Sequence, residues 1–162
     1  MRLTTFADLG LRSMMILGDL PEGERLTIAD LAKATNASDN HLARVIAKLV
    51  EMKLVVSVRG RNGGAYLSDT ARGASVGKIL RQIEGSNEVV DCAGTRPCPL
   101  AARDCALRHR LADAQEAFFA TLDDDTIGDL IATTRPVDMR TPEDAHGTSR
   151  ALGVPNVPRR SS

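Results

Sequence analysis

Two short amphipathic segments joined by a two-residue turn do most to constrain the fold of this chain. Thr27-Ile-Ala-Asp30 places a hydroxyl three residues before a carboxylate, a pattern typical of a helix start. Asn36-Ala37 then forms a short turn, and Ser38 can cap a second helix. Apolar residues of the second helix recur at i, i+3, i+4 and i+7, at Leu42, Val45, Ile46 and Leu49. The pattern predicts a helix-turn-helix whose second helix spans Ser38–Val50.

A β-hairpin is predicted directly after this motif. Leu54–Val58 and Ala65–Ser68 are short β-prone runs, and the turn between them, Arg59–Gly64, contains three glycines. Glycine permits the positive φ angles that a tight hairpin turn needs. A hairpin with a basic tip after a helix-turn-helix indicates a winged helix. We therefore expect a mainly α fold with a small β-hairpin.

Further helices are predicted on both sides of the winged helix. Thr4 or Thr5 can cap a first helix, Ser75 can cap a later one, and Asp123–Asp125 can cap a last short one. Between the last two, a seam repeats at steps of four, three and four, at Leu107, Leu111, Ala114 and Phe118. Such heptad-like spacing favours a long dimerisation helix, although the same stripe could instead pack on its own domain.

Charge is distributed unevenly although the formal net charge is zero. Ser38–Gly64 contains five basic and two acidic residues, and a local basic patch can bind DNA in a neutral protein. Asparagine and arginine side chains can read base edges, and lysine can hold phosphate. The candidate DNA contacts are Ser38, Asn40, His41, Arg44 and Lys48 on the second helix and Arg59 and Arg61 in the hairpin turn. The alternative is an ordinary solvated helix face.

All three cysteines lie in the stretch Val90–Ala106, with the spacing C-x5-C-x6-C of Cys92, Cys98 and Cys105. The N-terminus lacks the features of a signal peptide, and no apolar run is long enough to span a membrane. We therefore expect a cytoplasmic protein, in which structural disulfides are rare. Three clustered thiols favour a soft metal or an iron–sulfur cluster, one ligand short of a four-coordinate set.

Two other interpretations of the cysteines come from different classes of protein. One is a metal-free repressor that senses redox state through its thiols. The other is a small thiol enzyme, but the sequence lacks C-x-x-C, a P-loop and a Rossmann glycine pattern. We therefore expect that the protein is not an enzyme.

Four stretches together resemble a known family over roughly residues 1–133. These are MRLTTFADLGLR at the start, VRGRNGGAYLS in the hairpin, VVDCAGTRPCPLAARDC in the cysteine segment, and LADAQEAFFATLDDDTIGDLI after it. The chain resembles the iron–sulfur winged-helix transcription repressors of the NsrR/IscR superfamily, and it is most similar to the NsrR group of nitric-oxide sensors.

The resemblance implies a homodimeric repressor that binds double-stranded operator DNA and responds to nitric oxide. It also implies a 4Fe-4S cluster bound by Cys92, Cys98 and Cys105, with Asp8 of the other subunit as the fourth ligand. The IscR group instead uses a histidine three residues after its last cysteine to hold a 2Fe-2S cluster. That position is Arg108 here, with His109 next to it, so a 2Fe-2S regulator remains the alternative.

The predicted organisation has four parts. A winged helix-turn-helix domain spans residues 1–89, and a cluster-binding loop spans 90–106. The dimerisation helix and a terminal helix follow over 107–133. Residues 134–162 contain scattered prolines among polar and charged residues, a composition that indicates a disordered tail.

Overall fold

The structure is a computed structural model that describes residues 2–61, 63–85, 89–90, 92, 98–100 and 103–134. The predicted disordered tail therefore lies outside the described residues, apart from Thr134. Much of the predicted cluster-binding loop also lies outside them, but all three of its cysteines are described.

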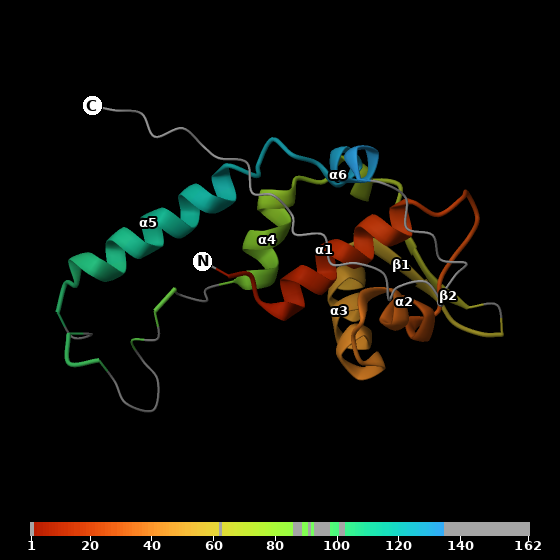
Figure 1. Cartoon of the computed structure of the whole chain (residues 1–162), viewed down its shortest axis with the longest axis horizontal. Coiled ribbons are helices and arrows are strands. Elements are labelled where there is room, and N and C mark those ends of the chain that lie inside the picture. Colours follow the sequence, from red (N-terminus) through yellow and green to blue (C-terminus); the bar gives the residue numbers. More distant parts are fainter. Residues whose placement is uncertain are drawn as a thin grey trace, which may run out of the picture.

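The described residues form a mainly α fold with one small antiparallel sheet (Figure 1), which confirms the predicted fold class. The elements are α1 (Thr5–Gly18), α2 (Ile28–Thr35), α3 (Asp39–Glu51), β1 (Val55–Val58), β2 (Gly64–Leu67), the 3-10 helix η1 (Ala71–Gly73), α4 (Val76–Glu84), α5 (Ala106–Ala120) and α6 (Ile127–Thr133).

Side-chain hydroxyls begin most of the helices, as the sequence predicts. The hydroxyls of Thr4, Thr27, Ser38 and Ser75 accept hydrogen bonds from backbone N–H groups in the first turns of α1, α2, α3 and α4. Each bond satisfies one of the donors that a helix N-terminus leaves unpaired. These four predicted helix starts are confirmed.

The start of α6 differs from the prediction. Its cap is Thr126, and not any of the residues Asp123–Asp125. The Thr126 hydroxyl accepts from the Asp129 N–H at 3.1 Å, and the Asp129 carboxylate accepts from the Thr126 N–H at 3.0 Å. This reciprocal pair satisfies two backbone donors, whereas a single capping carboxylate would satisfy fewer.

The turn of the helix-turn-helix is short because α2 ends in a left-handed residue. Asn36 has φ 53° and ψ 44°, a conformation that asparagine tolerates better than most residues. Ala37 then donates its N–H to the Ala32 carbonyl at 2.9 Å, which closes the end of the helix. The chain can therefore enter α3 directly after Ala37.

The wing is the hairpin of β1 and β2, with Val55 opposite Leu67 and Val58 opposite Gly64. Leu26 extends the sheet by a short antiparallel bridge, since it exchanges both backbone hydrogen bonds with Ala65, at 3.1 and 2.8 Å. The segment before α2 is thereby joined to the wing.

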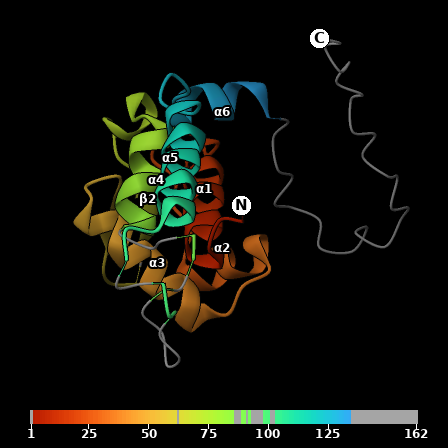
Figure 2. The ribbon, with the colours of Figure 1, turned by 90° about the vertical axis from the view of Figure 1, so that its left-hand side faces the viewer.

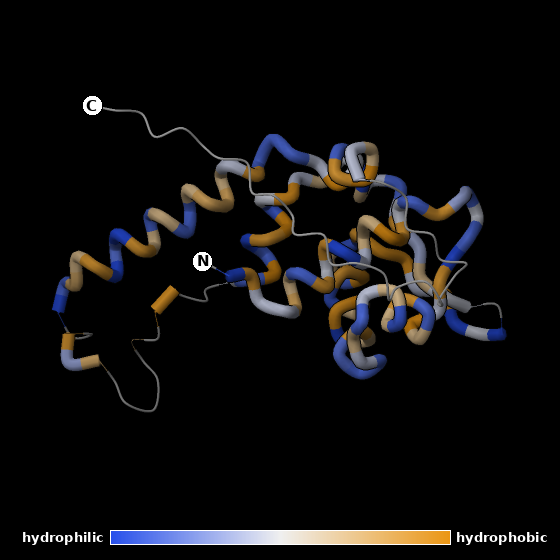
Figure 3. The backbone as a smooth tube through the Cα atoms, viewed as in Figure 1, coloured by the Kyte–Doolittle hydropathy of each residue, from blue (hydrophilic) through white to orange (hydrophobic). Residues whose placement is uncertain are grey.

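Apolar residues of several elements pack together around α1. This helix lies among α3, α4 and α6 (Figure 1), and hydrophobic residues, drawn in orange, recur along the backbone of these helices (Figure 3). Met14 of α1, Leu42 and Leu49 of α3, Leu80 of α4 and Ile127 of α6 are fully buried. The terminal helix α6 therefore shares one core with the helices of the winged helix. No helix in the described ranges is long and apolar enough to cross a membrane.

α5 projects from the rest of the molecule and meets it mainly near its C-terminal end (Figures 1 and 2). Phe119 is the buried residue of this helix, whereas Leu107 and Phe118 are 64% and 37% exposed. The apolar stripe predicted from the sequence is therefore largely open to solvent in the single chain.

Candidate functional site

α3 separates its residues cleanly between core and solvent. Its apolar face is fully buried, while Asn40 and Arg44 are exposed. Lys48 is half-buried, and its Nζ lies 2.9 Å from Glu51 Oε1. The Ser38 hydroxyl accepts a hydrogen bond from the His41 N–H at 3.4 Å and so caps α3. Ser38 is also exposed at this end of the helix.

His41 is the predicted DNA contact whose surroundings differ from the others. Its side chain is half-buried, and its ring lies against Phe6 of α1 with centroids 6.1 Å apart and planes tilted by 41°. This separation is within the range of attractive aromatic pairs. The sequence did not predict this contact, because Phe6 and His41 belong to different helices.

The wing tip is basic and exposed. Arg59 and Arg61 are both exposed on the turn between the strands. At the base of the wing, the Arg25 guanidinium lies 5.9 Å from the centroid of the Tyr66 ring. Arg25 was not among the predicted contacts, and its position beside β2 depends on the pairing of Leu26 with Ala65.

The three cysteines lie at the edge of α5 and in the segment before it. The Cys98 N–H donates to the Cys92 carbonyl at 3.2 Å, which brings these two residues together through the backbone. Cys105 is the N-cap residue of α5, where its carbonyl accepts from the His109 N–H at 3.3 Å. All three thiols are half-buried, and no disulfide joins them.

Asp8 lies in the first turn of α1, far from the cysteines in sequence. Its carboxylate is 45% exposed and accepts a hydrogen bond from Arg12 Nε at 2.8 Å. Within the described part of the chain, no three His, Cys, Asp or Glu side chains lie close enough together to hold a metal ion. The described chain therefore does not bring Asp8 and the three thiols together.

The chemistry of these donors nevertheless fits an iron–sulfur cluster. Three thiols of one segment can ligate three irons, and an accessible carboxylate can serve as the remaining ligand. Ligands of metal sites commonly assemble only when the metal binds. His109, the reserve candidate, is 65% exposed, and its Nε2 lies 2.5 Å from Asp104 Oδ1, so a carboxylate already engages that nitrogen.

The start of α1 is attached to the end of α4. Glu84 is only 7% exposed, and its Oε1 accepts hydrogen bonds from the Thr4 N–H at 2.8 Å and the Thr4 hydroxyl at 3.1 Å. Glu84 is the last residue of α4, and the cysteine segment follows it in the chain. This contact joins the helix that carries Asp8 to the helix that precedes the cysteines.

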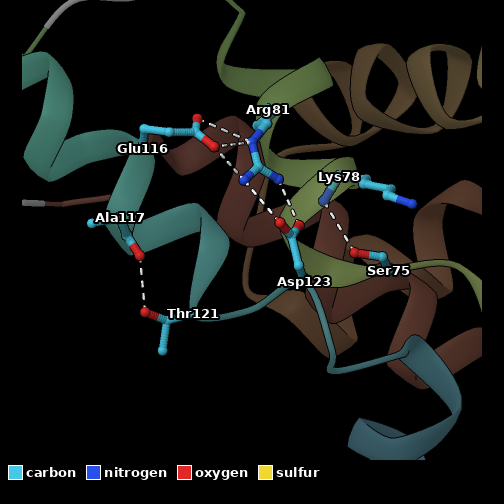
Figure 4. Close-up of polar contacts among 7 residues, drawn as sticks. All are labelled: Ser75, Lys78, Arg81, Glu116, Ala117, Thr121 and Asp123. Atoms are coloured by element: carbon cyan, nitrogen blue, oxygen red, sulfur yellow. Dashed lines mark hydrogen bonds and ion pairs between the residues drawn. The ribbon is translucent and has the colours of Figure 1, made fainter.

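A second polar contact fastens α5 to α4 (Figure 4). The Arg81 guanidinium lies between Glu116 of α5 and Asp123 of the turn that follows, at 2.6 Å from an oxygen of each. It also lies 5.7 Å from the centroid of the buried Phe119 ring. Sequence reasoning missed this contact, because its members are far apart in the chain.

Hydrogen bonds from Arg81 lower the pKa of both Glu116 and Asp123 below the ordinary carboxyl range. The same hydrogen bonds, to Glu116 and then to Asp123, raise the pKa of Arg81. All three groups are therefore charged at neutral pH, and the contact acts as an ionic joint between α4 and α5.

Gly77 allows this joint to close. A Cβ atom at Gly77 would collide with the Phe119 carbonyl oxygen and with Asp123 Oδ1. The Gly77 N–H donates to the Leu122 carbonyl at 2.9 Å, so the backbone of α4 lies directly against the end of α5. Only glycine permits this approach without a shift of one helix.

Known proteins that resemble this chain are transcriptional regulators. A family model described as Rrf2, an iron-dependent transcriptional regulator, matches residues 3–133. The HTH-type transcriptional repressor NsrR of Streptomyces coelicolor is 47% identical over 139 residues, which cover 85% of this chain and 93% of that protein.

Solved structures with the same fold include CymR, the global cysteine regulator of B. subtilis, and IscR of T. potens. CymR aligns with a TM-score of 0.61 at 24% identity, over 83% of this chain and 99% of that chain. IscR aligns with a TM-score of 0.61 at 23% identity, over 86% of this chain and 96% of that chain. At these identities the likeness concerns the fold.

Proposed function

The chain belongs to the Rrf2 family of transcriptional regulators, and from that premise we propose that it is a nitric-oxide-sensitive repressor. In this proposal it acts in the cytoplasm as a homodimer on double-stranded operator DNA, through a 4Fe-4S cluster. The observation that carries the proposal is the position of all three thiols between the winged helix and the open apolar stripe of α5.

DNA binding is assigned to α3 and the wing. Asn40 and Arg44 are exposed on the face of α3 opposite the core, with Lys48 on the next turn, so the helix can lie in a major groove. Ser38 stands at the end of α3 that would approach the bases. Arg59 and Arg61 are exposed at the wing tip, where they can contact the phosphate backbone or the minor groove.

Dimerisation is assigned to α5. Leu107, Ala114 and Phe118 are exposed along one stripe of this helix, and apolar side chains arranged in this way are stabilised by burial against a partner. A second copy supplies a matching stripe. A two-fold dimer would also place two copies of α3 on a two-fold symmetric operator.

Cluster binding is assigned to Cys92, Cys98 and Cys105 of one subunit and Asp8 of the other. The exposed carboxylate of Asp8 can reach outward from α1, at the cost of its contact with Arg12. A bound cluster would supply iron atoms that react with nitric oxide. In the chain itself, the start of α5 positions Cys105, a backbone hydrogen bond joins Cys98 to Cys92, and a helix of the core carries Asp8.

The decisive test is anaerobic purification followed by titration with nitric oxide while operator binding is measured. We expect iron and sulfide at about four of each per subunit, and a loss of operator affinity of about a hundred-fold or more during the titration. Protein without iron, sulfide or visible absorbance would contradict the sensor proposal and favour a metal-free thiol repressor. About two irons per subunit would favour a 2Fe-2S regulator.

Asp8→Ala tests the fourth ligand. We expect the cluster of this variant to be lost faster in air than that of the unmodified protein, because a ligand of one iron is removed. Asp113→Ala, which removes an exposed carboxylate of α5, is the matched control and should leave cluster lifetime unchanged. Equal cluster lifetimes in all three proteins would contradict the assignment of Asp8 as the fourth ligand, even if the protein binds a cluster.

A further inference from the structure

The first turn of α1 makes contacts in three directions. Thr4 is bound to Glu84 at the end of α4, Phe6 lies against His41 of α3, and Asp8 is paired with Arg12 on the surface. Thr4 and Phe6 therefore connect this turn to α4 and α3, whereas Asp8 is paired within α1 itself. The turn is a junction between the proposed ligand Asp8 and the helix that the proposed function places on DNA.

The contact to α3 is made at its N-terminal end, the end that the proposed function places nearest the DNA bases. His41 belongs to the first turn of α3, and its N–H is bound to the capping hydroxyl of Ser38. The N-terminal residues of a recognition helix are those that contact base edges. A displacement of the His41 ring would therefore move the residues at the DNA-facing end first.

The contact to α4 limits how the turn can move. Glu84 is buried and holds both the N–H and the hydroxyl of Thr4, so the start of α1 is fixed relative to α4. The Asp8 carboxylate, one turn later, is 45% exposed, and among the residues that the structure describes its side-chain partner is Arg12. If Asp8 changes its partner, the first turn of α1 is displaced at Asp8 while it stays fixed at Thr4. Phe6 lies between these two residues in the sequence.

We propose that Phe6 and His41 are positioning residues that couple the state of Asp8 to the orientation of the recognition helix. This rests on the proposed function. When Asp8 leaves Arg12 for the cluster of the partner subunit, the first turn of α1 shifts, and the Phe6 ring carries His41 and the start of α3 with it. His41 then acts through the fold and does not read a base.

The test compares operator dissociation constants of cluster-free and cluster-loaded protein for the unmodified chain and for Phe6→Leu. The ratio of the two constants measures the coupling between cluster and DNA. We expect this ratio to fall by about two- to ten-fold in Phe6→Leu, the range of one aromatic contact, while the visible absorbance of the cluster is unchanged. His41→Gln, at a half-buried position, should behave in the same way.

Arg44→Ala is the control for a direct DNA contact. Because its side chain is exposed on α3, we expect it to weaken binding of both forms equally and to leave the ratio unchanged. If His41→Gln shows that same uniform loss, His41 is a DNA contact and the coupling proposal is wrong. An unchanged ratio in Phe6→Leu would also overturn it.

A second readout needs no DNA. Hydrogen exchange of the backbone amides in the first turn of α3 should change on cluster loading in the unmodified protein and change less in Phe6→Leu. Equal changes in both proteins would contradict the coupling. If cluster loading leaves operator affinity of the unmodified protein unchanged, the proposed function itself fails, and that result is distinct from a Phe6→Leu variant that responds normally.

Discussion

α3 and α5 are helices of similar length that stand in very different relation to the core. α3 has 13 residues and buries Leu42, Val45, Ile46 and Leu49. α5 has 15 residues and buries Phe119 alone. The first helix therefore satisfies its apolar face within one chain, while the second leaves most of its stripe exposed.

This difference indicates that α3 contributes mainly to the stability of the single chain and that α5 is available for assembly. A helix that buries a full stripe is held by many contacts at once, so its position relative to α1 is well determined. α5 is held near one end, by Phe119 and by the ionic joint of Arg81. In the proposed dimer, its exposed apolar residues Leu107, Ala114 and Phe118 would contact a second copy.

The largest expected effect is in α3. Leu42→Ala removes a fully buried side chain, and we expect the free energy of unfolding to fall by about 2–5 kcal/mol. Leu107→Ala, at a residue that is 64% exposed, should change it by less than about 0.5 kcal/mol at concentrations where the protein is monomeric. Urea unfolding measures the free energy of unfolding of both variants. Similar losses in the two would contradict the proposed difference between α3 and α5.

The next effect is at the joint between α4 and α5. Gly77→Ala forces a Cβ atom against the Phe119 carbonyl and Asp123, and we expect a loss of about 1–3 kcal/mol on unfolding. Gly73→Ala is the control, because a Cβ atom there meets nothing within 4 Å. If Gly77→Ala unfolds like the unmodified protein, α5 is not held at this point.

A smaller effect on folding but a clear one on assembly is expected for Leu107→Glu. A carboxylate on the exposed stripe would be buried without a partner in the dimer, so we expect the dimer dissociation constant to rise at least about ten-fold. Ala120→Glu adds the same charge at an exposed position outside the stripe. Sedimentation of both variants decides the matter, and equal dissociation constants would place the dimer contact elsewhere.

The smallest effect is the acid dependence of the ionic joint. The pKa values of Glu116 and Asp123 are lowered in the folded chain by hydrogen bonds from Arg81. Their contribution to stability is therefore present above the ordinary carboxyl pKa of about 4 and is lost as pH falls through the lowered folded values.

Arg81→Gln should flatten this part of the profile, because the cause of the lowered pKa values is removed. Melting temperatures measured between neutral pH and acid should fall less steeply below about pH 4 in this variant. Arg110→Gln, which removes a 3.9 Å pair of exposed side chains with Asp113, should keep the steep fall. Parallel profiles for Arg81→Gln and the unmodified protein would show that the joint contributes nothing measurable.

Local sequence predicted the parts of the fold that depend on neighbouring residues. The hydroxyl caps at Thr4, Thr27, Ser38 and Ser75 are confirmed because a cap and its backbone donor are three residues apart. The predicted cap of α6 was wrong because, in the sequence, the three successive aspartates Asp123–Asp125 are as good a capping pattern as Thr126. The reciprocal bond with Asp129 decided between them.

The candidate site divides in the same way. The sequence by itself determined the donor types, since cysteine thiols, exposed basic residues and the apolar stripe of α5 can be recognised from spacing and charge. It also determined the winged helix, because helix periodicity, a short turn and a glycine-rich hairpin are all local signals.

Only the tertiary structure decided which of these residues meet. Thr4 and Glu84 are 80 positions apart, and neither they nor Phe6 and His41 carry a spacing that predicts their contact. Arg81 likewise finds Glu116 and Asp123 only once α4 and α5 have packed. Such contacts depend on the relative placement of whole helices, and that placement is set by the sum of many buried contacts rather than by any one local pattern.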